Sequence, residues 1–252
     1  MRRSKAYGFI GRTLSGAKLA AAWVGLVAAC PVAAADGPEV GVPADLPGPG
    51  PFVSRTAEQP VIKAEVIARG LAHGYSLAFL PGGDALVVER GARLRLLRGA
   101  TGPKPALVAT PIANAPEYAQ AEHLNVLDVL GIQDVMPDPD FATNHLIYLT
   151  YNRPVGYDSR AGRITAVTAV ARARLDGLQL TGLTDLLVGE ARVATGGSRI
   201  LVAPDGLLYV SVGALSEGDI RSAQRTDTIY GKVLRIGRDG SVPKDNPFAG
   251  TK

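Results

Sequence analysis

The stretch Arg199–Val212, RILVAPDGLLYVSV, shows how this chain is built. Two short apolar segments flank a Pro-Asp-Gly turn, a pattern typical of two antiparallel strands joined by a tight connection. Related patterns occur in Ser76–Val88, SLAFLPGGDALVV, and in Asp134–Leu149, DVMPDPDFATNHLIYL. The repetition predicts a series of small antiparallel sheets.

Further strand-like sequence follows each of these pairs, in Ala92–Leu97, Ile164–Leu175 and Lys232–Ile236. Repeated small sheets at this spacing favour an all-β fold of the β-propeller type over a sandwich. We predict about three blades, whereas a closed propeller needs roughly four to eight. Because an open arc leaves strand edges unpaired, we expect the chain to be part of a longer propeller or to pair with a second copy as a homodimer.

Composition excludes several classes of protein. Hydrophobic residues make up 46% of the 252 residues and charged residues 20%, which excludes a mainly disordered chain. The net charge is +4, but five of the 27 basic residues lie in residues 1–35, which contain no acidic residue. The remainder holds fewer bases than the 23 acids, so no basic surface predicts a nucleic-acid partner.

Residues 1–35 have the pattern of a secretion signal. A basic start is followed by the apolar run Leu19–Cys30, and Ala33–Ala35 offers a small-residue cleavage site. The run is too short to span a bilayer comfortably, which takes about 20 residues. We therefore predict export, to a periplasm or beyond. The alternative is a lipid anchor at Cys30, since VAAC resembles a bacterial lipobox.

Two further regions follow the signal. Residues 36–60 contain six Pro and four Gly without apolar periodicity, which predicts an extended linker. Residues 61–252 are predicted to form the folded region. Cys30 is the one cysteine, so neither an internal disulfide nor a cysteine metal site is expected.

Four segments carry a resemblance to a known family. They are Gly70–Leu97, Gly131–Tyr148, Gly196–Gly213 and Tyr230–Phe248, the last reading YGKVLRIGRDGSVPKDNPF. Together, and in this order, they resemble the soluble pyrroloquinoline-quinone (PQQ)-dependent sugar dehydrogenases, also called glucose/sorbosone dehydrogenases. The resemblance covers about residues 63–250 and the N-terminal half of the family's propeller.

The resemblance implies a periplasmic six-bladed propeller that oxidises an aldose at its anomeric carbon and passes a hydride to PQQ, with Ca²⁺ as a second cofactor. Such chemistry needs a base for the hydroxyl proton and positive charge near the quinone oxygens. In the family a His is the base, an Asp orients it, and an Arg and Ca²⁺ stabilise the quinone. Most cofactor ligands would lie beyond residue 252.

This sequence departs from the family at the base. Thr195 stands at the position of the His, and Ala214 follows Gly213 where the family has its Asp. A Thr hydroxyl is no base near neutral pH without a partner. The family's active-site Gln aligns with Val129, and Gln133 lies four residues further on.

We take Thr195, Gln133 and Asp134 as the candidate catalytic positions and Arg199 as the candidate cofactor-binding residue, with no metal ligand assigned. Arg199 fits a contact near the propeller channel and a structural ion pair equally well. Two functions stay open at this point. One is an exported PQQ-dependent sugar dehydrogenase, truncated and inactive as it stands; the other is a non-catalytic exported propeller that binds a partner. The sugar and the electron acceptor are not determined.

Overall fold

The computed structural model describes residue 48 and residues 50–89, 93–116, 130–158, 160, 163–193, 195–214 and 220–249. The chain divides into two compact units, Met1–Leu46 and Pro47–Lys252, and every element below belongs to the second. The predicted signal, its cleavage site, Cys30 and Val129 lie outside the described residues.

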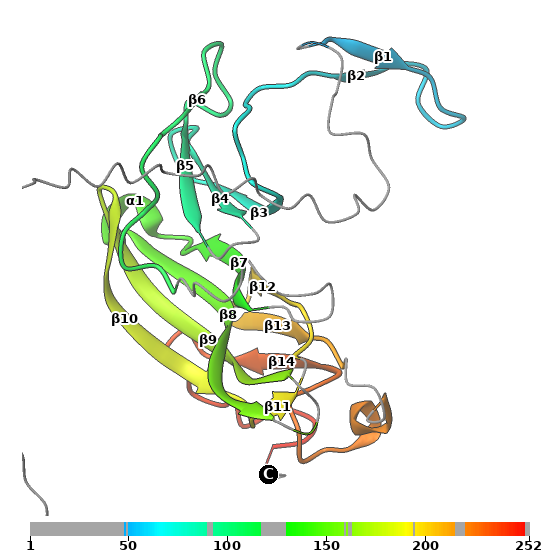
Figure 1. Cartoon of the computed structure of the whole chain (residues 1–252), viewed down its shortest axis with the longest axis vertical. Coiled ribbons are helices and arrows are strands. Elements are labelled where there is room, and N and C mark those ends of the chain that lie inside the picture. The colour runs from blue at the N-terminus through cyan, green and yellow to red at the C-terminus, as the bar shows by residue number, and fades with distance from the viewer. Residues whose placement is uncertain are drawn as a thin grey trace, which may run out of the picture. The chain divides into compact units, whose positions relative to one another are not determined.

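The described residues form three antiparallel sheets of blade type and one short hairpin (Figure 1). Blade I contains β3 (Gly74–Phe79), β4 (Ala85–Glu89), β5 (Leu94–Arg98) and β6 (Ala106–Leu107) in that order. Blade II contains β7 (Gly131–Pro137), β8 (Leu146–Asp158), β9 (Arg163–Asp176) and β10 (Gln179–Val188), with β11 (Arg192–Val193) paired to β9. Blade III contains β12 (Ser198–Val202), β13 (Leu208–Val212) and β14 (Lys232–Ile236). The predicted all-β propeller arc of about three blades is confirmed.

Short connections follow from the turn residues. Between β12 and β13, Gly206 has a φ of +80° and donates its N–H to the Ala203 carbonyl. Glycine adopts this left-handed conformation without steric cost, which explains the Pro-Asp-Gly sequence. The corresponding connection in blade II includes the helical turn α1 (Phe141–Asn144), and a 3₁₀ turn, η2 (Ile220–Gln224), precedes β14.

A strand also occurs in the segment expected to be an extended linker. β1 (Phe52–Ser54) pairs antiparallel with β2 (Ile62–Ala64). The short run Phe-Val-Ser has the aromatic and β-branched character that suits a strand, and this signal is easily masked by the surrounding Pro and Gly.

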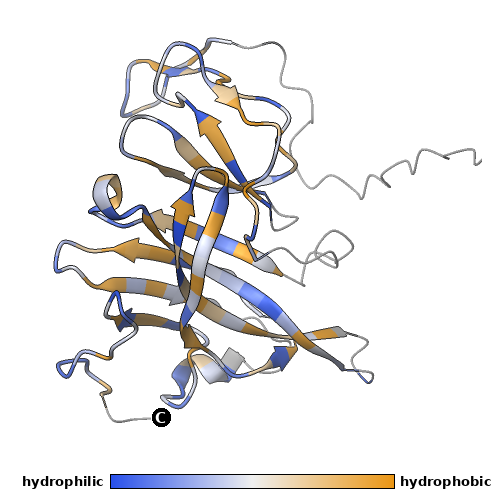
Figure 2. Ribbon diagram, turned by 90° about the vertical axis from the view of Figure 1, so that its left-hand side faces the viewer, coloured by the Kyte–Doolittle hydropathy of each residue, from blue (hydrophilic) through white to orange (hydrophobic). Residues whose placement is uncertain are grey.

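The core lies between the blades, because successive residues of a strand face opposite sides. On β8, Ile147 and Leu149 join the cluster shared with blade I, whereas Tyr148 between them joins the cluster shared with blade III. Figure 2 shows the matching mixture of apolar and polar residues along the strands. The first strands of the blades, β3, β7 and β12, lie next to one another, with β7 in the middle. This arrangement places the candidate site residues of β7 and β12 side by side.

Candidate functional site

Asp134 joins the first strands of all three blades. It follows a bulge in the β7–β8 pairing, in which Gln133 is the extra residue. One carboxylate oxygen of Asp134 accepts a hydrogen bond from the Ser76 hydroxyl on β3, and the other accepts one from the Ile200 N–H on β12, at 2.8 Å. The residue is 8% exposed. Asp134 therefore connects neighbouring blades that share no backbone ladder at this place.

Arg199 makes a second connection between the same strands. Its Nη1 donates to the Gln133 carbonyl at 2.8 Å and its Nη2 to the Tyr75 carbonyl at 3.2 Å. The guanidinium also lies 4.7 Å from the centre of the Tyr75 ring and 3.7 Å from the Asp134 carboxylate. The two interpretations of Arg199 are thus no longer equally supported. These contacts give it a structural role between blades, and its contact with a cofactor stays a prediction.

Gln133 is buried, with 1% of its surface exposed. Its Nε2 donates to the carbonyls of Leu130 and Gly131, at 3.3 and 2.9 Å, which folds the side chain back over the start of β7. Among the described residues its Oε1 has no hydrogen-bond partner. Gln133 therefore retains one free acceptor, but the acceptor is enclosed by protein.

Thr195 lies just before β12 and is 2% exposed. The carbonyl of the next residue, Gly196, accepts a hydrogen bond of 3.1 Å from the Asn152 side chain. A Cβ added at Gly196 would lie 2.6 Å from backbone atoms of Gly213, so these two segments of the backbone lie as close together as glycine allows. The Gly213 N–H donates to the Gly197 carbonyl, which extends the β12–β13 pairing. Thr195 and Ala214 consequently occupy the same end of blade III.

These two residues offer no general base. Ala214 carries only a methyl group and cannot accept a proton, and a threonine hydroxyl is itself no base near neutral pH. The correspondence of positions 195 and 214 to the family's His and Asp stays a prediction. The relation between positions 195 and 214 follows from the strand pairing.

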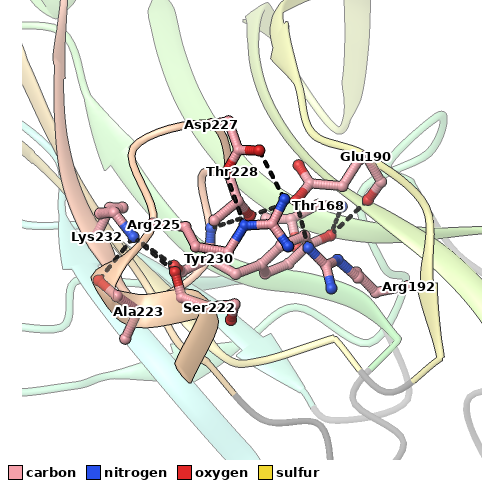
Figure 3. A network of polar contacts seen from close by, with 10 residues as sticks. All are labelled: Thr168, Glu190, Arg192, Ser222, Ala223, Arg225, Asp227, Thr228, Tyr230 and Lys232. Carbon is pink, nitrogen blue, oxygen red and sulfur yellow. Dashed lines mark hydrogen bonds and ion pairs between the residues drawn. The ribbon is translucent and has the colours of Figure 1, made fainter. Parts of the chain in front are cut away.

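A polar network that the sequence analysis did not identify begins behind this end of blade III (Figure 3). Asn152 accepts a hydrogen bond from the Thr168 hydroxyl at 2.7 Å, and the Thr168 N–H reaches the Tyr230 hydroxyl at 3.4 Å. Tyr230 in turn donates to the Glu190 carbonyl at 2.9 Å. Burial raises the pKa of the Tyr230 hydroxyl, so it serves as a hydrogen-bonding group rather than an acid.

The Glu190 carboxylate forms the charged part of this network. It accepts hydrogen bonds from the Thr228 hydroxyl and from Arg192, the latter at 2.9 Å. Burial alone would raise the pKa of Glu190, but the hydrogen bonds from Thr228 and Arg192 outweigh it and lower the pKa. Glu190 therefore stays ionised and connects blade II to the segment that leads into β14.

The sequence offered little sign of these supporting residues. Tyr75 alternates with Leu77 and Phe79, which indicates one face of a strand but not a contact with Arg199. Asn152, Thr168 and Tyr230 occur in no recognisable motif. Their roles depend on contacts between blades, which no local pattern encodes.

The described residues do not by themselves fit the family's cofactors. Among them, no three His, Cys, Asp or Glu side chains lie close enough together to hold a metal ion. Two of the five N–H groups of Arg199 donate to backbone carbonyls, and Thr195 is enclosed. We therefore derive no chemical step through PQQ or Ca²⁺ from this part of the chain.

Comparison with known proteins identifies the family. The family model for glucose/sorbosone dehydrogenases matches residues 71–252, which include all three blades. The chain belongs to the glucose/sorbosone dehydrogenase family. This match confirms the resemblance inferred from the four sequence segments.

Individual relatives agree with this assignment. An uncharacterized protein of Synechocystis, slr1608, is 36% identical over 203 residues, which cover 76% of this chain and 47% of that protein. The aldose sugar dehydrogenase YliI of Escherichia coli is 30% identical over 194 residues, covering 74% of this chain and 47% of YliI.

A solved relative supports the fold. The PQQ-bound aldose sugar dehydrogenase of Streptomyces coelicolor matches with a TM-score of 0.56 and 27% identity, over 73% of this chain and 50% of that one. The glucose/sorbosone dehydrogenase chain described here spans about half the length of the relatives that it matches. No helix in the described part of the chain is long and apolar enough to cross a membrane.

Proposed function

We propose that this protein is an exported, PQQ-dependent sugar dehydrogenase-type protein that acts on an aldose at its anomeric carbon, with the quinone accepting the hydride. The observation that carries the proposal is the family match over all three blades. The proposed organisation is a secretion signal in residues 1–35, a linker in residues 36–60 and a partial propeller in residues 61–252. The proposed location is the periplasm, with a lipid anchor at Cys30 as the alternative.

The proposed partners are a small sugar and an electron acceptor of unknown identity. PQQ and Ca²⁺ are the proposed cofactors, because the family relatives include a protein solved with PQQ bound. By family resemblance, the proposal places most of the cofactor ligands beyond residue 252. Arg199, Gln133 and Asp134 are then proposed to shape the cofactor side of the site from β7 and β12.

The direct test combines a binding and an activity measurement. The complete gene product is purified and titrated with PQQ in the presence of Ca²⁺, and dye-linked oxidation is followed with a panel of aldoses. Saturable PQQ binding together with turnover supports the dehydrogenase. Absence of both overturns it for this chain.

A second function is favoured by the residues at the end of blade III. By the family resemblance, Thr195 stands in place of the His base and Ala214 in place of the Asp that orients it. Thr195 is also buried. We therefore propose, as the alternative, a non-catalytic exported propeller that kept the fold and binds a partner. PQQ binding without turnover favours this alternative.

The double variant Thr195→His/Ala214→Asp separates the two proposals. If only the base has been lost, the variant gains aldose turnover that the unaltered protein lacks. Each single variant serves as a matched control, because a His without its orienting Asp is a poorer base. No gain in a variant that still binds PQQ shows that more than the base is missing.

A further inference from the structure

Lys232, the first residue of β14, directs its ammonium group at three backbone carbonyls (Figure 3). Its Nζ donates to the oxygens of Ser222, Ala223 and Tyr230 at 3.2, 2.9 and 3.0 Å. A lysine ammonium has three N–H donors and no acceptor, so all of its donors are used. Among the described residues no carboxylate lies within ion-pair distance of Lys232.

Three converging carbonyl oxygens need a cation. Ser222 and Ala223 lie in the last turn of η2, where carbonyl groups carry partial negative charge; the Ser222 carbonyl also accepts a hydrogen bond of 3.0 Å from the Arg225 N–H. The Tyr230 carbonyl points to the same place and adds a third oxygen with partial negative charge. Without a positive charge between them, these groups would repel one another or require water.

The cation also lies beside a close approach of two chain segments at Gly231. Gly231 has a φ of +71°, and a Cβ added there would lie 2.6 Å from the Cβ of Ala223 and 3.0 Å from that of Ala214. Gly231 thus allows η2 to approach both β14 and the residue after Gly213. The position of η2 is therefore coupled to the end of blade III that carries Thr195 and Ala214.

We propose that Lys232 is a positioning residue whose ammonium is the tethered cation of a three-carbonyl site, and that this site holds η2 against Gly231 and Ala214. The site is built for a small cation with N–H donors or for a bare monovalent cation. A planar guanidinium cannot direct three donors at three converging oxygens in this way. The proposal concerns the packing of η2 and does not depend on whether the protein is a dehydrogenase.

The test is rescue of a cavity variant by a free cation. Lys232→Ala in the 252-residue chain removes the ammonium and with it three hydrogen bonds to carbonyls, and we expect its Tm to fall by about 5 °C. Methylammonium chloride should restore at least half of that loss in a saturable manner. Tetramethylammonium chloride at equal ionic strength should restore none, because it has no N–H donor.

Two matched variants sharpen the result. Lys232→Met fills the space of the lysine side chain with an apolar side chain. This variant should therefore lose the same stability and gain nothing from methylammonium. Lys244→Ala removes an exposed lysine in the loop after β14 and should change neither Tm nor its salt response. Equal effects of the two salts on Lys232→Ala, or rescue of Lys232→Met, would overturn the proposal.

A measurement on the unaltered protein covers the case in which these variants do not fold. In a nitrogen-detected NMR spectrum of the lysine ammonium groups, Lys232 should show a signal protected from exchange with water, and Lys244 should not. Equally fast exchange at both lysines contradicts a closed carbonyl site.

Discussion

The guanidinium of Arg199 lies 4.7 Å from the centre of the Tyr75 ring, although the two residues belong to blades III and I. Blade II separates these sheets, so the contact reaches across the first strand of the middle blade. Arg199 bonds to that strand as well, through the Gln133 carbonyl. One side chain thus fixes the relative position of three sheets at the centre of the arc.

Removing this side chain should loosen the contact between the blades. Arg199→Ala loses two hydrogen bonds to carbonyls and the contact with Tyr75, and we expect the free energy of unfolding to fall by about 1–2 kcal/mol. The side chain is 51% exposed, which keeps the loss below that of a buried charge. Urea unfolding measures it. Arg98→Ala, which removes an exposed pair with Asp84, is the control and should cost less than about 1 kcal/mol.

Gly196 should tolerate no side chain. The closest backbone atoms of Gly213 lie 2.6 Å from an added Cβ, and backbone cannot move aside as a flexible side chain can. We expect Gly196→Ala to cost about 3 kcal/mol or to prevent folding. Gly156→Ala, with nothing within 4 Å of the new Cβ, should stay within about 1 kcal/mol of the unaltered protein. Similar stabilities for the two variants would contradict the close approach.

Stability should fall in acid through Asp138. Burial acts to raise the pKa of this carboxyl, but hydrogen bonds from Tyr148 and Asn144 and the nearby Arg238 outweigh it and lower the pKa below its ordinary value of 3.8. A lowered pKa in the folded state means that the contribution is full above the unfolded value and declines as the pH falls through the folded value. We therefore expect progressive loss of stability below about pH 4.

The variant Asp138→Asn isolates this contribution. It should be less stable than the unaltered protein at pH 7, because Arg238 and Tyr148 lose a charged partner that lies between blades II and III. Its urea midpoint should also change less between pH 5 and pH 3. Parallel pH profiles for the two proteins would show that other carboxylates are responsible.

The outer face of blade III should promote self-association. Val233 on β14 is 71% exposed and Leu201 on β12 is 52% exposed, both on the side turned away from blade II. Exposed apolar residues on an open sheet favour contact with another sheet. In Val233→Glu, the apparent molar mass from light scattering should rise less with protein concentration. The free energy of unfolding should not fall. Val242→Glu, at an exposed loop position, is the control and should leave the association unchanged.

The sequence could predict part of the candidate site but not the residues that support it. Thr195, Gln133, Asp134 and Arg199 are predicted by analogy with the family to lie near the channel ends of strands, and the structure places Gln133, Asp134 and Arg199 together. Tyr75, Asn152 and Lys232 were not predicted, since each interacts through a backbone carbonyl, either its own or that of another residue. A carbonyl is present at every residue, so no residue type marks the partner.

The sequence alone determined the antiparallel strand pairs, their turns and the family, because alternation, Pro-Asp-Gly connections and ordered motifs are local properties. It also showed that position 195 carries Thr and position 214 carries Ala. Only the tertiary structure decided that Arg199 donates hydrogen bonds to residues of the two other blades and that Lys232 donates to three backbone carbonyls. Those contacts depend on which strands become neighbours, and that is set by the packing of the sheets as a whole.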